Sequence, residues 1–245
     1  QGSQALHKNA PLIAVWDDHE FSNDAWKRGA ENHSEDGAEG DFYARRSAAI
    51  KAYYEWMPIR EQKNKRKIFR EFTIGKLIHL VMLDTRQYAR DKQIQPKDYL
   101  SKSGFNQAKF YNDLNSEDRD LLGFEQLSWI ENRISKSSAA WTILGQQVLM
   151  TKLKFPDLSK MLKTEDIPSF VKPYLKFLGL GIPSNLDAWD GYPEERKRLY
   201  KLMNDSKKHF ISVSQYLSRN ISKCYPKVNN VSIANPGLSK NFTNN

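Results

Sequence analysis

The sequence contains a single cysteine, Cys224, among its 245 residues. One thiol cannot form an internal disulfide, which excludes a disulfide framework and a cysteine-rich zinc site. No segment approaches the ~18 consecutive apolar residues that a membrane-spanning helix requires. The start, Gln1 to Lys8, contains neither an initiator methionine nor the apolar core of a signal peptide. The natural N-terminus can lie upstream of Gln1, so the missing signal peptide does not indicate in which compartment the protein resides.

The composition is that of a folded protein with a basic surface. Apolar residues make up 39% of the chain and aromatic residues 12%, which is typical of globular domains. The 38 basic residues exceed the 29 acidic ones and give a net charge of +9. Such a charge attracts phosphate-bearing substrates, nucleic acid or anionic envelope polymers. Specific nucleic-acid binding is not expected, because no zinc-finger or RNP-type motif accompanies the charge.

Strand and helix patterns alternate along the chain, which predicts an α/β fold. A helix is expected over 41–57, with Phe42, Tyr53 and Trp56 facing the core, and Pro58 ends it. Gly75-Lys76 predicts a hairpin turn. We interpret 91–123 as a long excursion and 154–186 as a lid-like irregular segment. The other expected strands are 12–16, 67–75, 77–83, 141–144 and 211–216, and the other expected helices are 124–135 and 194–203.

The apolar run Leu12 to Trp16 ends abruptly in Asp17-Asp18-His19-Glu20. If the run is a buried strand, these four side chains lie at the carboxyl edge of a sheet, where ligands bind in open α/β folds. Carboxylates are hard metal ligands, and histidine binds metals or transfers protons near neutral pH. The alternative is a strand end followed by a helix N-terminus, where Asp is favoured as a cap. Four such residues in succession favour the functional interpretation.

Two further strands end in polar residues, Asp84-Thr85-Arg86 and Gln146-Gln147. Carboxylates, a histidine and an arginine together suit metal-assisted phosphoryl transfer, in which metals polarise the phosphate and Arg pairs with its oxygens. For Asp84 to Arg86, a structural ion pair is an equally favoured interpretation. For the two glutamines, amides that satisfy backbone groups are slightly favoured. For His33, a solvent-exposed side chain is the default interpretation, and we assign no role to His7, His79 and His209.

A set of motifs in family order resembles the PhoD-like alkaline phosphatases of the calcineurin-like metallophosphoesterase superfamily. The resemblance covers about residues 11 to 205. It is carried by 16–20, 23–26, 29–33, 39–41, Arg45 with Arg46, 53–60, 83–86, 145–147 and 187–193 with Arg196.

The resemblance implies a four-layered αββα sandwich of mixed sheets whose N-terminal part is missing. It also implies metal-dependent hydrolysis of phosphate monoesters and of diesters such as those of teichoic acid-type polymers, with iron and calcium as cofactors. Asp18, with Asp17, is then expected to bind metal, and His19 to act on the leaving oxygen or the phosphoryl oxygens. Arg86 is our candidate for phosphate contact. The family's location suggests a periplasmic or extracellular protein.

The sequence departs from the family pattern at both ends. A metal-binding block of the type Gly-Asp-Tyr-Ile-Tyr-Glu is expected before residue 1. A Gly-Asp-x-His block is expected after the strand near 211–214, where the sequence reads Ser212 to Asn220 without it. We therefore expect a partial catalytic domain over 1–210 and a divergent tail over 211–245. Because Asp18 and His19 cannot hold two cations alone, we expect weak or no activity. A catalytically inactive, anion- or polymer-binding remnant is the alternative.

A shifted or truncated reading frame would explain the sudden loss of pattern after Phe210. We expect one of the other two frames of the coding DNA to restore a Gly-Asp-x-His block downstream of Phe210. Sequencing the gene with its flanking DNA checks this, and the hypothesis fails if neither frame encodes the block.

Overall fold

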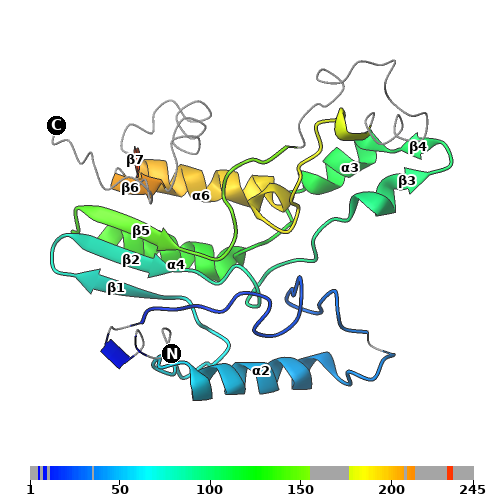
Figure 1. Ribbon diagram of the computed structural model, residues 1–245. Coiled ribbons are helices and arrows are strands. Elements are labelled where there is room, and N and C mark those ends of the chain that lie inside the picture. Colours follow the sequence, from blue (N-terminus) through cyan, green and yellow to red (C-terminus); the bar gives the residue numbers. More distant parts are fainter. Residues whose placement is uncertain are drawn as a thin grey trace. The chain divides into compact units, whose positions relative to one another are not determined.

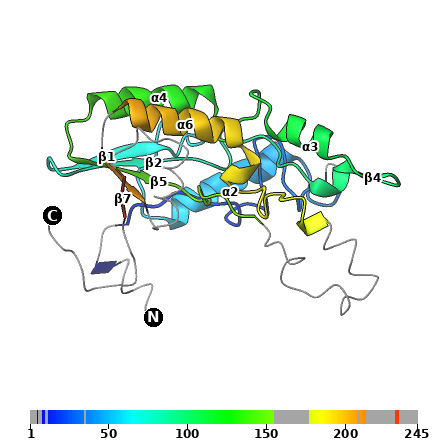
Figure 2. The same cartoon turned by 90° about the horizontal axis from the view of Figure 1, so that it is seen from above.

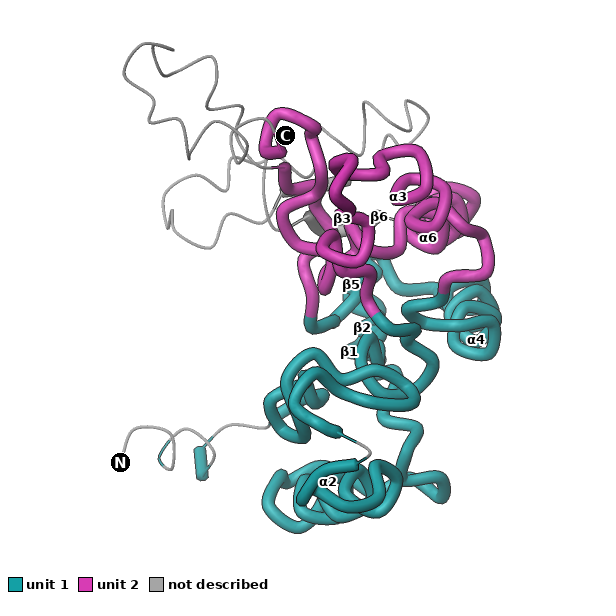
Figure 3. Tube along the Cα trace, turned by 90° about the vertical axis from the view of Figure 1, so that its right-hand side faces the viewer, with its two compact units in different colours: residues 1–92, 120–147, 208–210 teal, residues 93–119, 148–207, 211–245 magenta. Residues whose placement is uncertain are grey.

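The computed structural model describes residues 5, 8–9, 12–34, 36–154, 177–206, 209–212 and 231–233. The chain forms two compact units, shown in Figure 3. Unit 1 comprises 1–92, 120–147 and 208–210, and unit 2 comprises the remaining residues. Most of the predicted lid-like segment, 155–176, and most of the tail lie outside the described residues. The predicted boundary at residue 210 therefore stays a prediction.

A mixed β-sheet is the centre of the fold (Figure 1), with the strand order β1-β2-β5-β6-β7. Strands β1 and β2 pair antiparallel, whereas β2–β5 and β5–β6 are parallel. Helices accompany the strands, which confirms the predicted α/β class. The strands are β1 Arg70–Ile74, β2 Ile78–Met82, β5 Trp141–Gly145, β6 His209–Ser212 and β7 Val231–Ile233.

The predicted hairpin between the first two strands is confirmed. Ile74 pairs with Ile78, and the amide of Leu77 donates to the carbonyl of Ile74 at 3.3 Å. Gly75 has a φ of 55°, a conformation that glycine adopts without a Cβ penalty. The turn therefore sets the register of both strands from local sequence alone.

Strand β6 begins two residues before the predicted strand 211–216. His209 and Phe210 pair with Trp141 and Thr142 of β5. Residues 213–216 lie outside the described residues, so the C-terminal half of that prediction is not addressed.

Helix α2, Phe42–Trp56, agrees with the helix predicted over 41–57. The Asp41 carboxylate accepts a hydrogen bond from the Ala44 amide at 2.7 Å and caps the N-terminus. The helix ends before Pro58, as expected. Trp56 is 85% exposed, so the prediction that it faces the core is wrong. At about 100° per residue, Trp56 lies on nearly the opposite side of the helix from the buried Tyr54.

The core of unit 1 beside α2 is aromatic. Trp16 is 1% exposed and packs edge-on against Tyr53 and Tyr54, with ring centroids 5.5 and 6.3 Å apart. Ile50 and Ile68 complete this cluster. The prediction that the tyrosines at the end of the helix belong to the core is confirmed. Trp16 thereby holds the adjacent Asp17-Asp18 stretch in place.

The segment Leu12 to Trp16 is not a strand, so that prediction is wrong. None of its backbone groups joins a ladder with another described residue, and Ile13 is 37% exposed. Side chains bind two of its carbonyls instead: Arg70 Nη2 donates to Ala14 at 2.5 Å and Gln147 Nε2 to Trp16 at 2.8 Å. A strand requires a neighbouring backbone to pair with, and the described residues supply none here.

Helix α4, Gly123–Lys136, lies along one face of the sheet of unit 1 (Figure 2). Its residues Ile130 and Ile134 are fully buried, as the predicted amphipathic pattern requires. Leu127 is only partly buried. Trp129 packs on Phe69, with ring centroids 5.0 Å apart, and so connects the helix to the residue that precedes β1.

Unit 2 contains most of the predicted excursion 91–123, which is a small folded piece with its own core. Phe110 and Leu114 of α3 pack there with Ile182 and Leu186. The predicted helix start at Pro193 is confirmed in α6, where Arg196 forms a buried ion pair with Asp190 at 2.7 Å. The elements are η1 Pro96–Tyr99, β3 Leu100–Ser101, β4 Gly104–Phe105, α3 Gln107–Leu114, η4 Trp189–Gly191 and α6 Pro193–Asp205.

Among the described helices, none combines the length and the apolar character that crossing a bilayer demands.

Tyr53 provides a test of the aromatic core. Its buried hydroxyl has no hydrogen-bond partner among the described residues, and burial raises its pKa to about 12. We expect Tyr53→Phe to stabilise the fold by about 1 kcal/mol at pH 7, because it removes an unsatisfied buried hydroxyl. Between pH 10 and 12 the unfolded tyrosine loses its proton while the folded one keeps it, so wild-type stability falls as the pH rises.

The advantage of the Tyr53→Phe variant should therefore grow by up to about 2–3 kcal/mol over this range. Urea unfolding at pH 7 and pH 11 measures both effects, with Tyr43→Phe as the control at an exposed position of the same helix. An advantage of Tyr53→Phe that stays constant with pH would contradict the assignment.

Candidate active site

The end of strand β2 is organised by the carboxylate of Asp84, which is fully buried. Its Oδ2 accepts a hydrogen bond from Trp16 Nε1 at 3.1 Å, and its Oδ1 accepts from the amides of Arg86 and Gln87, each at 2.9 Å. Burial is the largest influence on the Asp84 carboxyl and raises its pKa, although these hydrogen bonds act in the opposite direction. Asp84 thus holds the turn after β2 against the segment that contains Trp16.

Gln147, just after β5, also connects the turn that follows β2 to the segment that contains Trp16. Its Oε1 accepts from the amide and the hydroxyl of Thr85, at 3.3 and 2.6 Å. Its Nε2 donates to the carbonyls of Trp16 and Leu83, at 2.8 and 3.1 Å. The amide group therefore satisfies backbone groups, as the favoured structural interpretation of Gln147 expected.

Asp17 and Asp18 meet Arg86 in one ionic cluster. Arg86 Nε donates to Asp17 Oδ1 at 2.5 Å, and Arg86 Nη2 lies 3.7 Å from Asp18 Oδ1. The side chains differ in exposure: Arg86 is 5% exposed and Asp18 9%, but Asp17 is 44% exposed. Because Gln147 also binds Thr85, all three polar segments that the sequence placed at strand ends are joined by direct contacts.

A tight turn fixes the orientation of Asp18. Its carbonyl accepts from the amides of Phe21 and Ser22, and its Oδ2 accepts from the amide of Asp24 at 2.8 Å. Burial raises the pKa of the Asp18 carboxyl, but the Asp24 hydrogen bond and the Arg86 guanidinium lower it more, so the pKa lies below its usual value. Asp18 is therefore an anchored carboxylate that stays ionised at neutral pH.

His19 lies beside this cluster and is open to solvent, with its side chain 80% exposed. Its Nε2 is 3.0 Å from Asn23 Oδ1 and 3.9 Å from Asp18 Oδ2. The Asn23 amide nitrogen donates to Glu31, which leaves Asn23 Oδ1 to accept from His19. This network assigns the proton to Nε2 in the neutral ring. Glu20 is exposed, and its carboxylate oxygen Oε2 accepts a hydrogen bond from the amide nitrogen of Asp17 at 2.9 Å.

The residues matched by a family model decide the classification. The model of the PhoD-like phosphatases matches residues 1–214. The chain belongs to this family. It is 32% identical over 200 residues to alkaline phosphatase D of Bacillus subtilis (strain 168), an alignment that covers 80% of this chain. A solved structure of PhoD superimposes with a TM-score of 0.56 at 28% identity, and also covers 80% of this chain.

This family member spans only part of the relatives that it matches. The alignments cover 29% of the Bacillus subtilis enzyme and 33% of the PhoD chain of known structure. Most of each relative therefore has no aligned counterpart in the 245 residues.

The described residues do not form a metal site by themselves. No group of three or more His, Cys, Asp or Glu side chains with suitable placement occurs among them. Within the cluster, Asp18 already binds the Asp24 amide, and Arg86 places a positive charge against both Asp17 and Asp18. A cation needs several oxygen or nitrogen donors at once, which these residues do not offer alone.

Other histidines have surroundings that the sequence did not reveal. His79, for which we expected no supporting neighbour, lies 2.7 Å from Glu71 across the hairpin and is 2% exposed. His33 Nδ1 is 3.3 Å from Arg45 Nη1, and its ring packs on Phe42. Among the described residues, the side-chain contacts of His79 and His33 are with residues outside the Asp18 cluster.

Sequence reasoning missed three residues that position the cluster. Asp24 has a φ of 51°, so that its amide can reach Asp18. Gln126 of α4 binds the backbone of Asp84 with both ends of its amide, each at 2.8 Å. The buried Arg90 donates to the carbonyl of Thr85. Only Asp24 carries a local signal, because Asp and Asn tolerate positive φ. Gln126 binds a residue 42 positions away in the chain, which no local pattern shows. Arg90 binds a carbonyl only five residues away, but no local motif marks it.

Gln147 is the residue whose loss should most weaken this assembly. We expect Gln147→Ala to lower the free energy of unfolding by about 2–3 kcal/mol, because it removes four hydrogen bonds to partly buried groups. Gln107→Ala, at an exposed glutamine of α3, serves as the control and should change stability by less than about 0.5 kcal/mol. Chemical denaturation of both variants measures the difference; equal stabilities would show that the Gln147 contacts are dispensable.

Proposed function

We propose that this chain carries part of a site for metal-dependent hydrolysis of phosphate mono- or diesters. Membership of the PhoD-like phosphatase family supports the reaction class. The observation that carries the proposal is the placement of an exposed His19 next to the anchored Asp18 carboxylate. His19 is thus accessible to a substrate, and the neighbouring Asp18 is held rigidly.

In this proposal the protonated ring of His19 donates its Nδ1 proton to the oxygen of the leaving alcohol and becomes the neutral ring, while Nε2 stays bound to Asn23. Asn23 orients the ring through its Oδ1, and Glu31 in turn holds the Asn23 amide. An oriented, solvent-accessible imidazole is a suitable general acid near neutral pH. Proton donation matters most for alkoxide leaving groups, which are poor, and least for p-nitrophenolate, which leaves without help.

Arg86 acts as a positioning residue in the arrangement described here. Because only 5% of its side chain is exposed and its Nε is bound to Asp17, it reaches solvent poorly. Its charge lowers the pKa of the Asp18 carboxyl and holds Asp17 close to Asp18. The direct phosphate contact expected for Arg86 then requires Asp17 to release it when substrate binds, which the 44% exposure of Asp17 allows.

Asp18, and Asp17 once released, are the proposed metal ligands of this chain. By family resemblance the metals are iron and calcium, and the remaining ligands come from outside the described residues. The same resemblance supports the four-layered αββα sandwich and a periplasmic or extracellular location. When bound, such metals polarise the phosphoryl group and activate water.

The alternative function is that of a non-catalytic remnant that binds anions or anionic polymers. The absence of any three-residue metal cluster among the described residues favours it, together with the net charge of +9. Metal content separates the two functions: stoichiometric iron and calcium in the purified chain supports the enzyme, and their absence supports the remnant.

We expect the purified chain to hydrolyse p-nitrophenyl phosphate weakly at most, because its metal ligands are incomplete. The residual rate should disappear with a chelator and in Asp18→Asn, and should persist in Asp36→Asn, a change at an exposed aspartate outside the cluster. His19→Gln should slow glycerol phosphate hydrolysis by about 10²-fold or more, and p-nitrophenyl phosphate hydrolysis much less.

Phosphate release measured with excess enzyme, alongside elemental analysis for iron and calcium, gives these rates and the metal content. Fast, chelator-sensitive turnover would contradict the expected impairment. The same loss for both substrates in His19→Gln would contradict the role of His19 as the acid. If the chain shows no turnover and contains no bound metal, the result would support the non-catalytic, anion-binding alternative.

A further inference from the structure

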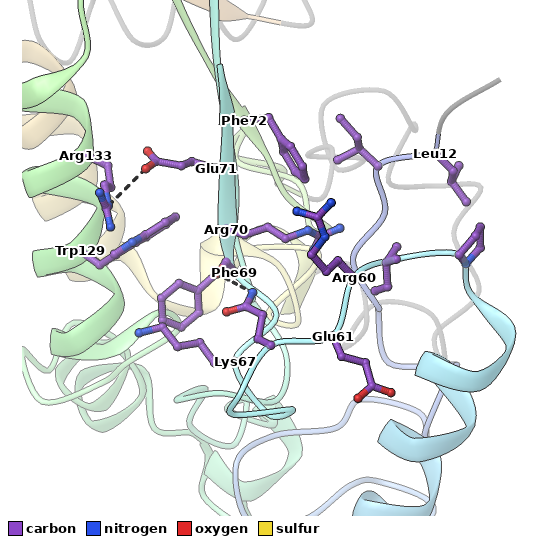
Figure 4. A pocket seen from close by; sticks show the side chains of 14 residues that line it. Leu12, Arg60, Glu61, Lys67, Phe69, Arg70, Glu71, Phe72, Trp129 and Arg133 are labelled. Atoms are coloured by element: carbon purple, nitrogen blue, oxygen red, sulfur yellow. Dashed lines mark hydrogen bonds and ion pairs between the residues drawn. The ribbon is translucent and has the colours of Figure 1, made fainter. Parts of the chain in front are cut away.

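A cavity of about 770 Å³ lies in unit 1, away from the Asp18 cluster (Figure 4). Three pieces of chain surround it: strand β1 with the residues before it, the segment 58–62 after α2, and helix α4 through Trp129 and Arg133. Leu12 and Ile13 close the remaining side. None of the residues that contact Asp18 lines this cavity.

The cavity runs along the outer edge of β1, as its lining indicates. Four consecutive residues, Phe69 to Phe72, all line it. Successive side chains of a strand point to opposite faces of a sheet, so a cavity above one face would be lined by alternate residues only. Figure 4 shows Glu71 pointing toward α4, and Arg70 and Phe72 pointing the other way. The cavity therefore reaches both faces around the strand edge.

The outer edge of β1 presents backbone N–H and C=O groups that no described strand pairs with. Strand β1 is the first in the sheet order, and β2 is its only partner among the described residues. Every second residue of an edge strand presents its N–H and C=O away from the sheet, ready to pair with another chain. The exposed edge strand is a template for the addition of one more strand.

The opposite wall is a second stretch of backbone without a pairing partner. Leu12 to Trp16 has the sequence of a strand but joins no ladder with the described residues. It is connected to β1 by the Arg70 side chain, which donates to the Ala14 carbonyl, and not by backbone hydrogen bonds. The groove thus lies between an edge strand and a strand-like segment.

Charges differ on the two sides of the β1 edge. On the α4 side, Arg133 lies 3.3 Å from Glu71, so these charges neutralise each other next to the ring of Trp129. On the other side are Arg60, Arg70 and Glu61, and the Glu61 carboxylate lies 3.0 Å from Lys65. Neither arginine forms an ion pair with a described carboxylate; Arg70 donates to the carbonyls of Ala14 and Ile68 and packs on the Phe72 ring. One side of the groove is therefore apolar and neutral, and the other is cationic.

We propose that this groove binds an extended acidic peptide segment of a partner protein, which adds to the edge of β1 as a strand. The alternation of a strand sends every second side chain to each side of the groove. Acidic side chains would then face Arg60 and Arg70, and apolar side chains would face Trp129 and Phe69. The chemistry thus selects a segment in which acidic and apolar residues alternate. This binding function is separate from phosphoester hydrolysis and does not depend on it.

The test uses a fluorescein-labelled peptide of alternating valine and glutamate, about six residues long, the length of a typical strand. Fluorescence polarisation with the full chain should show saturable binding. A peptide of alternating valine and lysine should bind at least about tenfold more weakly, because its charges face Arg60 and Arg70. A valine–glutamate peptide with N-methylated amides along one edge should also bind at least about tenfold more weakly, since it cannot donate to β1.

Arg60→Glu is the matching protein variant, because Arg60 is exposed and its replacement should leave the fold intact, which circular dichroism checks. It should weaken binding of the glutamate peptide by about tenfold and strengthen binding of the lysine peptide. Arg28→Glu makes the same charge change at an exposed arginine outside the groove and should alter affinity by no more than about twofold. Equal binding of acidic and basic peptides, or equal binding of the N-methylated peptide, would overturn the proposal.

Discussion

The buried hydrogen bond between Trp16 Nε1 and the Asp84 carboxylate is the contact on which the rest of unit 1 depends. Trp16 belongs to the aromatic core beside α2, and Asp84 lies two residues after the end of β2. The bond therefore joins a segment without secondary structure of its own to the sheet. Because an unpaired buried carboxylate costs several kcal/mol, Asp84 and its partners must stay together.

The candidate active site lies where this connection places it. Asp17 and Asp18 follow Trp16 directly, and Arg86 follows Asp84 by two residues, so the Trp16–Asp84 bond brings Asp17 and Asp18 close to Arg86. Gln147 adds the end of β5 to the same point. The acidic and basic groups can then compensate each other's charge, and His19 is left facing solvent. A site assembled in this way is rigid on the protein side and open on the solvent side.

The lack of a backbone pairing partner among the described residues accounts for two features of unit 1. Leu12 to Trp16 remains irregular, and the outer edge of β1 stays open, because no described backbone pairs with the segment or with that edge. Between them lies the groove with its cationic side. The proposed metal site is similar, because the described residues supply one well-anchored carboxylate, Asp18, but no group of three potential metal ligands.

The sequence was sufficient for features that depend on neighbouring residues. The bounds of α2 follow from Asp41 and Pro58, the hairpin from Gly75, and the start of α6 from Pro193, since caps and turns are local interactions. The ordered motifs also identified the family. Local patterns could not place Gln126 and Gln147 against Asp84 and Trp16, 42 and 131 residues away in the chain. They also predicted a strand at Leu12 to Trp16, because propensity measures how well a segment fits a sheet and not whether a partner is present.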